Sequence, residues 1–454
     1  MERKHRRLIE IGKDILIAAL ALSAVYLTFR TQITNFAPQS GGWLGSLVQL
    51  VGGGAGQLLG PAEPEAPREV PVYPARVVVT NADLARYGVQ YDTTATDEVF
   101  GRVFSVLGEA LSSAESPSRV SEQTWREALS ERPGVYFDFL GQYPLETLLS
   151  WLEQGAENAA LTGAARRLLL AEDGNGRAVL YYHNAADGSY YACGTSGAVL
   201  NHLRSAVEGV GSNGLKYAFE YDSSEGLANL YPYVLLDTQP PSPPVYQVSN
   251  PLGNLEDQDA VWSLLSSMEA LGFQSQSGTP YQPGSGEWVV NEGTDQLRIS
   301  AGGTVSFRTD EGAEARYPVL QAGESPTATE LLDAVQPIAA GTIGERCGAA
   351  RLYLIGLTEL ADGTWQADFG YSLNGAAVQL YSEGYAARFL IRNGAVVEFT
   401  LHFRSYTATG ETSSVLPEVQ AAAALGALEA EGGELVLCYE DSGGETVQAG
   451  WIAQ

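Results

Sequence analysis

The 454-residue chain has little cysteine, histidine, methionine or positive charge, and each shortage argues against a class of site. Its three cysteines, Cys193, Cys347 and Cys438, show no CxxC spacing, which disfavours a disulfide framework and a cysteine-type zinc site. Four histidines and two methionines leave little material for a transition-metal or haem centre. Because 54 acidic residues outnumber 26 basic ones, the formal net charge is −28, which argues against a nucleic-acid partner. We therefore expect no cofactor and no metal.

Apolar residues and turn-forming residues are abundant. Hydrophobic residues make up 45% of the chain, so it can bury substantial cores and is not a disordered protein as a whole. The 51 glycines and 21 prolines predict many turns. This composition favours a structure with much antiparallel sheet.

A basic head and an uncharged apolar run open the sequence. Residues 1–13 are rich in arginine and lysine, and Ile15 to Phe29 carries no charge. As a helix this run spans about 22 Å, and flanking residues can extend it toward the roughly 30 Å hydrocarbon core of a bilayer. The positive-inside rule places the head in the cytoplasm. We predict a single-pass anchor at 14–33 of a cell-membrane protein whose bulk is extracellular.

Two other interpretations of the apolar run are weaker. Its length also fits the apolar part of a cleaved signal peptide, but no small-x-small site follows it, and Phe29 and Arg30 occupy the place where cleavage is expected. A buried core helix fits poorly because the run is apolar on all faces.

The predicted anchor contains two pairs of small residues at helical spacing. Ala19 pairs with Ser23, and Ala24 pairs with Thr28. Such pairs let two helices approach closely in lipid, although alanine is common in any anchor. These four residues are the candidate partner-binding face.

Residues 34–74 are predicted to form a tether. The stretch GGWLGSLVQLVGGGAGQLLG is rich in glycine, and PAEPEAPREVP is rich in proline and glutamate. The helical spacing of Leu44, Leu47, Val48 and Val51 fits a short piece at the membrane interface equally well.

From residue 75 onward we expect an α+β region of tandem modules with antiparallel sheets and packed helices. Pro-rich and acidic breaks divide it into an N-terminal ectodomain (75–239), a middle module (245–322) and a C-terminal module (323–454). Apolar periodicity predicts helices over 99–111, 122–129, 144–154, 196–207, 259–271, 328–339 and 417–429. Asp-Gly and Asn-Gly pairs predict hairpin turns at 173–174, 187–188, 362–363, 374–375 and 393–394.

No motif of catalytic chemistry is recognisable. The sequence has no HExxH, GxSxG, Walker A or EF-hand pattern. The segment that begins at Asp173 looks superficially like a calcium loop, but a hairpin turn is the better interpretation. Asp138 and Glu146 could serve as a carboxylate pair in a hydrolase, yet any acidic protein offers such pairs. His402 lies in an alternating run and is interpreted as a strand residue.

The 23 tyrosines are concentrated in places. The stretch YYHNAADGSYYACG (181–194) combines tyrosine with asparagine and serine, a composition suited to a recognition surface. The alternative, sheet tyrosines filling a half-buried face, is favoured for any single residue.

Several stretches resemble the YycH/YycI group of Gram-positive bacteria. RYGVQYD (86–92), WREALSERPGVYFDF (125–139) and PLETLLSWL (144–152) resemble the first ectodomain of YycH-like proteins. FGYSLNGAAVQL, AARFLIRNGAVVEFTLHFRSY and the closing GWIA resemble the YycI-type domain, a module related in shape to PepSY domains. The basic head and single anchor match the architecture of this group.

The resemblance implies a regulator and not an enzyme. Such proteins associate with the sensor histidine kinase of the Wal (Yyc) two-component system and with a second accessory membrane protein. Binding one kinase conformation better than another suffices to change signalling. The alternatives are an anchored binding module for cell-wall or secreted components and, less favoured, an envelope hydrolase.

Overall fold

The computed structural model describes residues 71–453, apart from residues 154, 222–230, 238–239, 274–277, 285, 311–313, 321–322, 324, 381–382 and 428–433. The predicted head, the predicted anchor and the tether up to residue 70 lie outside the described residues, and so do Ala19, Ser23, Ala24 and Thr28. Among the described helices, none combines the length and the apolar character that a membrane crossing requires.

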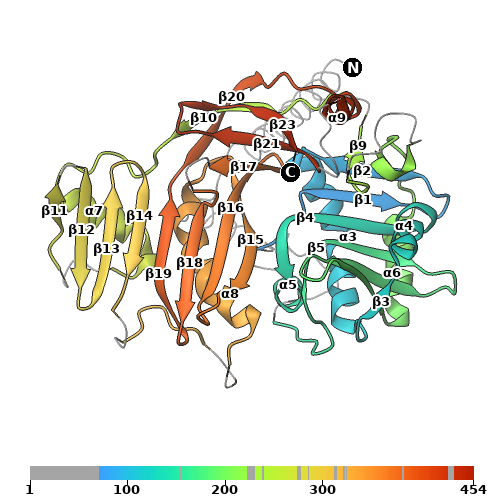
Figure 1. The fold of residues 1–454 in the computed structure, drawn as a ribbon, viewed down its shortest axis with the longest axis horizontal. Coiled ribbons are helices and arrows are strands. Elements are labelled where there is room, and N and C mark those ends of the chain that lie inside the picture. Colours follow the sequence, from blue (N-terminus) through green and yellow to red (C-terminus); the bar gives the residue numbers. More distant parts are fainter. Residues whose placement is uncertain are drawn as a thin grey trace, which may run out of the picture. The chain divides into compact units, whose positions relative to one another are not determined.

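A seven-stranded antiparallel sheet forms the N-terminal part of the described chain (Figure 1). Its strands follow the order β2-β1-β4-β5-β6-β7-β3. Their bounds are β1 (Arg76–Thr80), β2 (Arg86–Gln90), β3 (Ser118–Val120), β4 (Gly134–Pro144), β5 (Ala164–Glu172), β6 (Ala178–Asn184) and β7 (Ser189–Gly194). Helices cover both faces of this sheet. Successive residues of a strand point to opposite faces, and in the central strands the residues on both faces are apolar.

The two faces of this sheet have separate cores. On one face, Phe137 of β4 packs with the apolar sides of α3 (Thr93–Ser113), α5 (Leu145–Leu152) and α6 (Gly197–Val207). On the other face, its neighbour Tyr136 packs with α4 (Glu122–Glu131) and the segment that carries the two-stranded β8 (Lys216–Tyr217) and β9 (Leu235–Leu236).

Local chemistry explains where the helices begin. The predicted helix over 122–129 is confirmed as α4, and the Ser121 hydroxyl accepts a hydrogen bond from the Thr124 amide at 3.1 Å. The predicted helix over 99–111 is confirmed within α3, which starts six residues earlier because the Asp92 carboxylate caps the Ala95 amide.

An eleven-stranded sheet forms most of the C-terminal part (Figure 1). Its order is β11-β12-β13-β14-β19-β18-β16-β17-β21-β23, and β15 also pairs with β16. Its neighbouring strands pair antiparallel, except that β17 and β21 are parallel. The strand bounds are β11 (Tyr281–Gly284), β12 (Glu287–Glu292), β13 (Asp295–Ser300), β14 (Thr304–Arg308), β15 (Arg351–Glu359), β16 (Trp365–Leu373), β17 (Ala376–Leu380), β18 (Ala387–Arg392), β19 (Ala395–His402), β21 (Leu435–Asp441) and β23 (Ala449–Ala453).

Strands of the predicted middle and C-terminal modules share this sheet, since β14 pairs with β19. The module boundaries themselves stay a prediction. A separate three-stranded sheet pairs β10 (Pro244–Ser249) with β20 (Ser405–Thr412) and β22 (Thr446–Val447).

The helices of this part are α7 (Gln258–Ser266), α8 (Ala328–Ala339) and α9 (Glu418–Ala427). The helix predicted over 259–271 is too long. Met268 takes φ −120° and ψ 65°, which interrupts the helix, and a separate 3₁₀ turn follows over Glu269–Leu271. Taken together, the elements confirm a mixed α+β fold with antiparallel sheets and packed helices.

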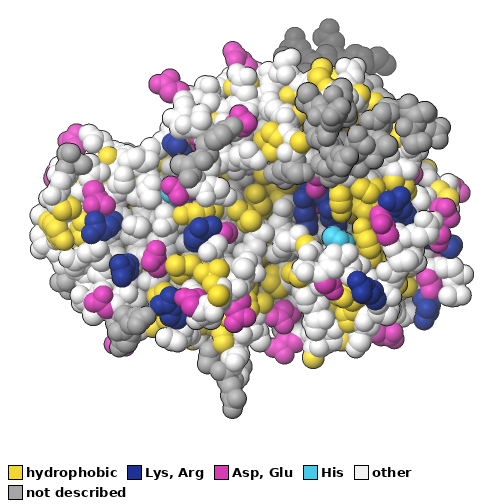
Figure 2. Space-filling view, viewed as in Figure 1, with side chains coloured by type: hydrophobic (Ala, Val, Ile, Leu, Met, Phe, Trp, Pro, Cys, Tyr) yellow, Lys and Arg dark blue, Asp and Glu magenta, His cyan; other side chains and the backbone are white. Residues whose placement is uncertain are grey.

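Acidic side chains are spread over the face drawn in Figure 2, interspersed with arginines and lysines. Such a mixture of both charges is typical of a solvated surface.

Candidate functional site

A row of charged side chains crosses three strands of the N-terminal sheet. The register of the sheet places Arg76 of β1 opposite Asp138 of β4, and Asp138 opposite Arg167 of β5. Directly opposed residues of antiparallel strands lie close enough to pair. The sheet therefore places the Asp138 carboxylate between two guanidinium groups.

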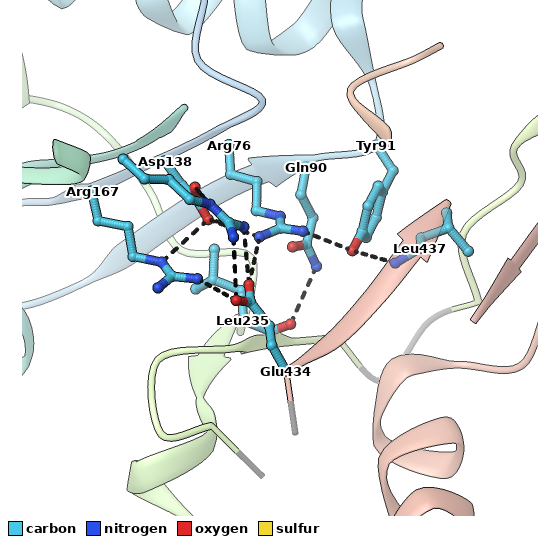
Figure 3. Close-up of polar contacts among 9 residues, drawn as sticks. Arg76, Gln90, Tyr91, Asp138, Arg167, Leu235, Glu434 and Leu437 are labelled. Carbon is cyan, nitrogen blue, oxygen red and sulfur yellow. Dashed lines mark hydrogen bonds and ion pairs between the residues drawn. The ribbon is translucent and has the colours of Figure 1, made fainter. Parts of the chain in front are cut away.

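Two further charges complete this cluster (Figure 3). Arg166 joins from β5, and Glu434 arrives from the residue before β21, 268 positions further along the chain. The β4–β5 register shifts between Asp138 and Tyr143, and such irregularities re-aim neighbouring side chains. Arg166 and Arg167, although adjacent in sequence, both contact Glu434. We call Arg76, Asp138, Arg166, Arg167 and Glu434 the ion cluster.

The distances within the ion cluster are those of charge-assisted hydrogen bonds. Asp138 Oδ2 lies 2.8 Å from Arg76 Nη1, and Asp138 Oδ1 lies 2.7 Å from Arg166 Nε. Glu434 Oε2 lies 2.6 Å from Arg167 Nη2, and its Oε1 lies 3.0 Å from Arg166 Nη2. The Asp138 side chain is only 2% exposed, so water contributes little to its solvation. Three guanidinium groups against two carboxylates give the cluster one net positive charge.

Electrostatics keeps both carboxylates ionised. Burial alone raises the pKa of Asp138, but the guanidinium groups of Arg166, Arg167 and Arg76 outweigh burial and hold this pKa well below its usual range. The pKa of Glu434 is also lowered, because the same arginines outweigh its burial. A carboxylate held this firmly in its charged form is suited to joining parts of the structure and not to proton transfer.

A second set of polar contacts extends from the cluster toward the C-terminal strands. Arg76 Nη2 donates to the Tyr91 hydroxyl at 3.2 Å, and that hydroxyl accepts the Leu437 amide of β21 at 3.4 Å. Gln90 of β2 donates to Glu418 of α9 at 3.0 Å (Figure 3 shows Gln90 beside Tyr91). The N-terminal sheet is thus bonded to both β21 and α9.

Glu418 is a buried carboxyl without a cationic partner in direct contact among the described residues. It is 2% exposed, and its Oε2 makes no hydrogen bond to any described atom. Burial raises the pKa of Glu418 from 4.5 to about 8, and the nearby negative charge of Asp237 adds to this effect. Glu418 is therefore mostly protonated at neutral pH.

The N-terminal sheet also touches β15 and α8. Leu354 of β15 donates its amide to the Tyr143 hydroxyl at 3.1 Å. Trp151 Nε1 of α5 donates to Asp333 of α8 at 2.9 Å, and the Ala328 amide donates to the Glu146 carboxylate at 2.9 Å. The ion cluster and these contacts together hold the two large sheets to each other.

Gly141 offers a sharp test of the contact between β4 and β15. A Cβ at this position would lie 1.7 Å from the carbonyl oxygen of Leu354 and 2.8 Å from that of Ile355. We expect Gly141→Ala to push the strands apart and to lower the free energy of unfolding by about 1–3 kcal/mol or more, measured by urea denaturation.

Gly101→Ala is the matched control for this substitution. Gly101 lies on the exposed side of α3, and a Cβ there meets no described atom within 4 Å. Alanine in an open helical position should stabilise the protein by about 0.5–1 kcal/mol. Equal effects of the two substitutions would contradict a tight β4–β15 contact.

The comparisons with known proteins bear on this architecture. No protein-family model matches the chain, and no curated protein matches it. Among solved structures, the crystal structure of YycH from Bacillus subtilis matches with a TM-score of 0.50 at 11% sequence identity. The match covers 86% of this chain and 95% of that chain. This chain has a YycH-like fold. The resemblance found in the sequence is thereby confirmed at the level of the fold.

The two carboxylates considered as a hydrolase pair, Asp138 and Glu146, bind different partners. Asp138 is bound by the arginines of the ion cluster, whereas Glu146 accepts the Ala328 amide. Asp173 forms a hairpin turn as predicted, and its Oδ1 accepts the amides of Asn175 and Arg177.

The tyrosine-rich stretch mainly contributes to the sheet. Tyr181 is 7% exposed and Tyr182 is 1% exposed, so both are sheet residues as the second interpretation predicts, but they are fully buried and not half-buried. Tyr190 and Tyr191 of β7 are half-buried. The three cysteines are free and buried, and burial raises the pKa of each thiol to about 11.

Sequence reasoning missed the ion cluster, although a signal for it was present. Arg76 precedes three valines in β1, and Asp138 lies between two phenylalanines in β4. A charged residue inside a buried apolar strand requires a partner of opposite charge.

Proposed function

We propose that this chain is a membrane-anchored, extracytoplasmic accessory protein that modulates a cell-envelope sensor histidine kinase. The observation that carries the proposal is the YycH-like fold, which extends over 86% of the chain. The basic head and apolar run at its start, and the stretches that resemble YycH-like proteins, support the same function.

The ion cluster suits a regulatory role that depends on binding. Because buried ion pairs and close strand contacts hold the two large sheets together, the described region presents a fixed surface to a partner. A preorganised surface loses little conformational entropy on binding. A preference of about 1.4 kcal/mol for one kinase conformation already changes the ratio of two states tenfold.

Proximity crosslinking in native membranes tests this function. The full-length protein is compared with a version whose residues 1–33 are replaced by an unrelated anchor. We expect the full-length protein to capture a sensor kinase, and the exchanged version to capture less of it. Capture of wall polymers or secreted proteins without any kinase would overturn the proposal in favour of a binding module.

The helix face gives a more specific prediction. Ala19→Leu with Ser23→Leu removes one small-residue pair and should reduce kinase capture, because bulky side chains keep the two helices apart. Ala18→Leu adds one leucine on another side of the predicted helix and serves as the control. Unchanged capture by the double variant would rule out this face as the contact.

A further inference from the structure

Four connecting segments meet around a polar cavity of about 360 Å³, outside the ion cluster. They are the β13–β14 turn, the end of β17 with nearby Glu383, the end of β19 and the turn after β21. Loops that a rigid sheet brings together are a common place for binding sites. Its lining includes four charged or titratable residues: Glu383, His402, Arg404 and Asp441.

Asp441 and Arg404 form the base of the cavity. The Asp441 side chain is fully buried, and it accepts the Tyr406 hydroxyl at 2.9 Å and the Gly443 amide at 2.9 Å. Arg404 Nε lies 3.3 Å from Asp441 Oδ2, so the carboxylate orients the guanidinium. Among the described residues, no hydrogen bond engages the terminal nitrogens of Arg404, whose side chain is 25% exposed. These nitrogens can bind a carboxylate in a bidentate manner.

His402 contributes a polar atom without a partner. Its Nδ1 lies 3.4 Å from the Thr304 hydroxyl, whereas its Nε2 is buried and makes no hydrogen bond to any described atom. A buried polar atom without a partner costs free energy, and a polar ligand atom would remove that cost.

The pKa of His402 depends on its burial and on two charged groups near it. Burial lowers the pKa of His402, the negative charge of Glu383 raises it, and the positive charge of Arg404 lowers it further. The imidazole is therefore mostly neutral at pH 7, and it lies within reach of both a carboxylate and a guanidinium.

The lining of this cavity offers groups of both charges, since Arg404 stands beside the carboxylates of Glu383 and Asp441. A simple anion meets Glu383 and the field of a protein with 28 excess negative charges. A simple cation is attracted by Glu383, but it leaves the terminal nitrogens of Arg404 without an acceptor. A ligand that carries both charges complements both groups at once.

We propose that this cavity binds a small zwitterion, an amino acid or short peptide, with its carboxylate on Arg404 and its ammonium group at Glu383. A cavity of about 360 Å³ lies at the lower end of the range for ligand pockets, which suits a molecule of this size. This site is independent of the proposed kinase contact, so failure of either proposal leaves the other intact.

Calorimetric titration of the full-length protein with three dipeptide probes tests the proposal. The probes are L-alanyl-L-alanine, its N-acetyl derivative and its C-terminal amide, which differ in which charges they carry. We expect the zwitterion to bind at least about tenfold more tightly than either blocked form, because each charge-assisted contact contributes to the affinity. No saturable binding of the zwitterion in the millimolar range, or equal binding of the acetylated form, would overturn the proposal.

Two variants assign the ends of the ligand. Glu383→Gln, in an exposed position, should remove most of the preference for the free amine. Glu359→Gln, at the exposed end of β15, should change nothing. Arg404→Lys keeps a positive charge beside Asp441 but loses the bidentate geometry. It should therefore weaken binding of the zwitterion more than binding of the C-terminal amide, which has no carboxylate. Full dipeptide affinity in both cavity variants would contradict the assignment.

Discussion

Asp138→Asn is expected to lower the free energy of unfolding by about 3–5 kcal/mol, because it leaves buried arginines without their shared carboxylate. Asp138 contacts Arg76 and Arg166 directly and lies 3.6 Å from Arg167. After the substitution, Glu434 alone faces three guanidinium groups. The asparagine keeps the shape of the side chain, so the effect reports the lost charge and not a cavity.

Urea denaturation of the full-length protein measures this effect through the midpoint at constant slope. Glu287→Gln is the matched control, since Glu287 pairs with Arg298 at 2.9 Å on the surface, where both side chains are more than one-third exposed. An exposed pair contributes about 0–1 kcal/mol. If Asp138→Asn cost no more than this control, the ion cluster would not hold the sheets together.

Stability should fall as pH rises from about 4.5 to about 8, through Glu418. In the folded protein burial raises the pKa of this carboxyl to about 8, whereas in the unfolded chain it ionises near 4.5. Between these values the folded state holds a proton that the unfolded state has released, so each pH unit costs about 1.4 kcal/mol. The full contribution of Glu418 is present below pH 4.5 and is lost above pH 8.

Glu418→Gln should flatten this pH dependence and stabilise the protein above pH 8, because the amide needs no proton to remain neutral. The glutamine oxygen can still accept the hydrogen bond from Gln90 that Glu418 Oε1 accepts. Glu411→Gln, at an exposed position of β20, is the control and should leave the pH profile unchanged. Denaturation midpoints measured across this pH range decide the matter; a slope that persists in the Glu418 variant would contradict its buried, protonated state.

The elements that could be predicted from the sequence are those determined by residues within the element itself, such as turn and capping residues. Asn374-Gly375 and Asn393-Gly394 form the hairpin turns expected of them, and all four residues take the positive φ values that such turns require. The helix that begins after Ser121 was equally predictable, because its cap lies within the segment itself.

The ion cluster was not predictable, because strand register and long-range contacts create it. Arg76 faces Asp138 only because β1 pairs with β4 in one particular register. Glu434 shows no feature that distinguishes it from other acidic residues of an acidic chain. The unpaired nitrogen of His402 is likewise invisible in the sequence, since its surroundings come from loops far apart in the chain.

The arrival of Glu434 from a distant part of the chain has a consequence for biosynthesis. Arg166 and Glu434 are 268 positions apart, and Tyr91 and Leu437 are 346 apart. Until β21 has been made, the three arginines of the nascent N-terminal sheet share only Asp138 and carry two excess charges. Closing a loop of this length costs little more free energy than closing one half as long. The N-terminal sheet nevertheless stays without its distant contacts until the C-terminal strands have been synthesised. The N-terminal sheet, although synthesised first, therefore gains its last buried ion pairs only when the C-terminal strands have been made.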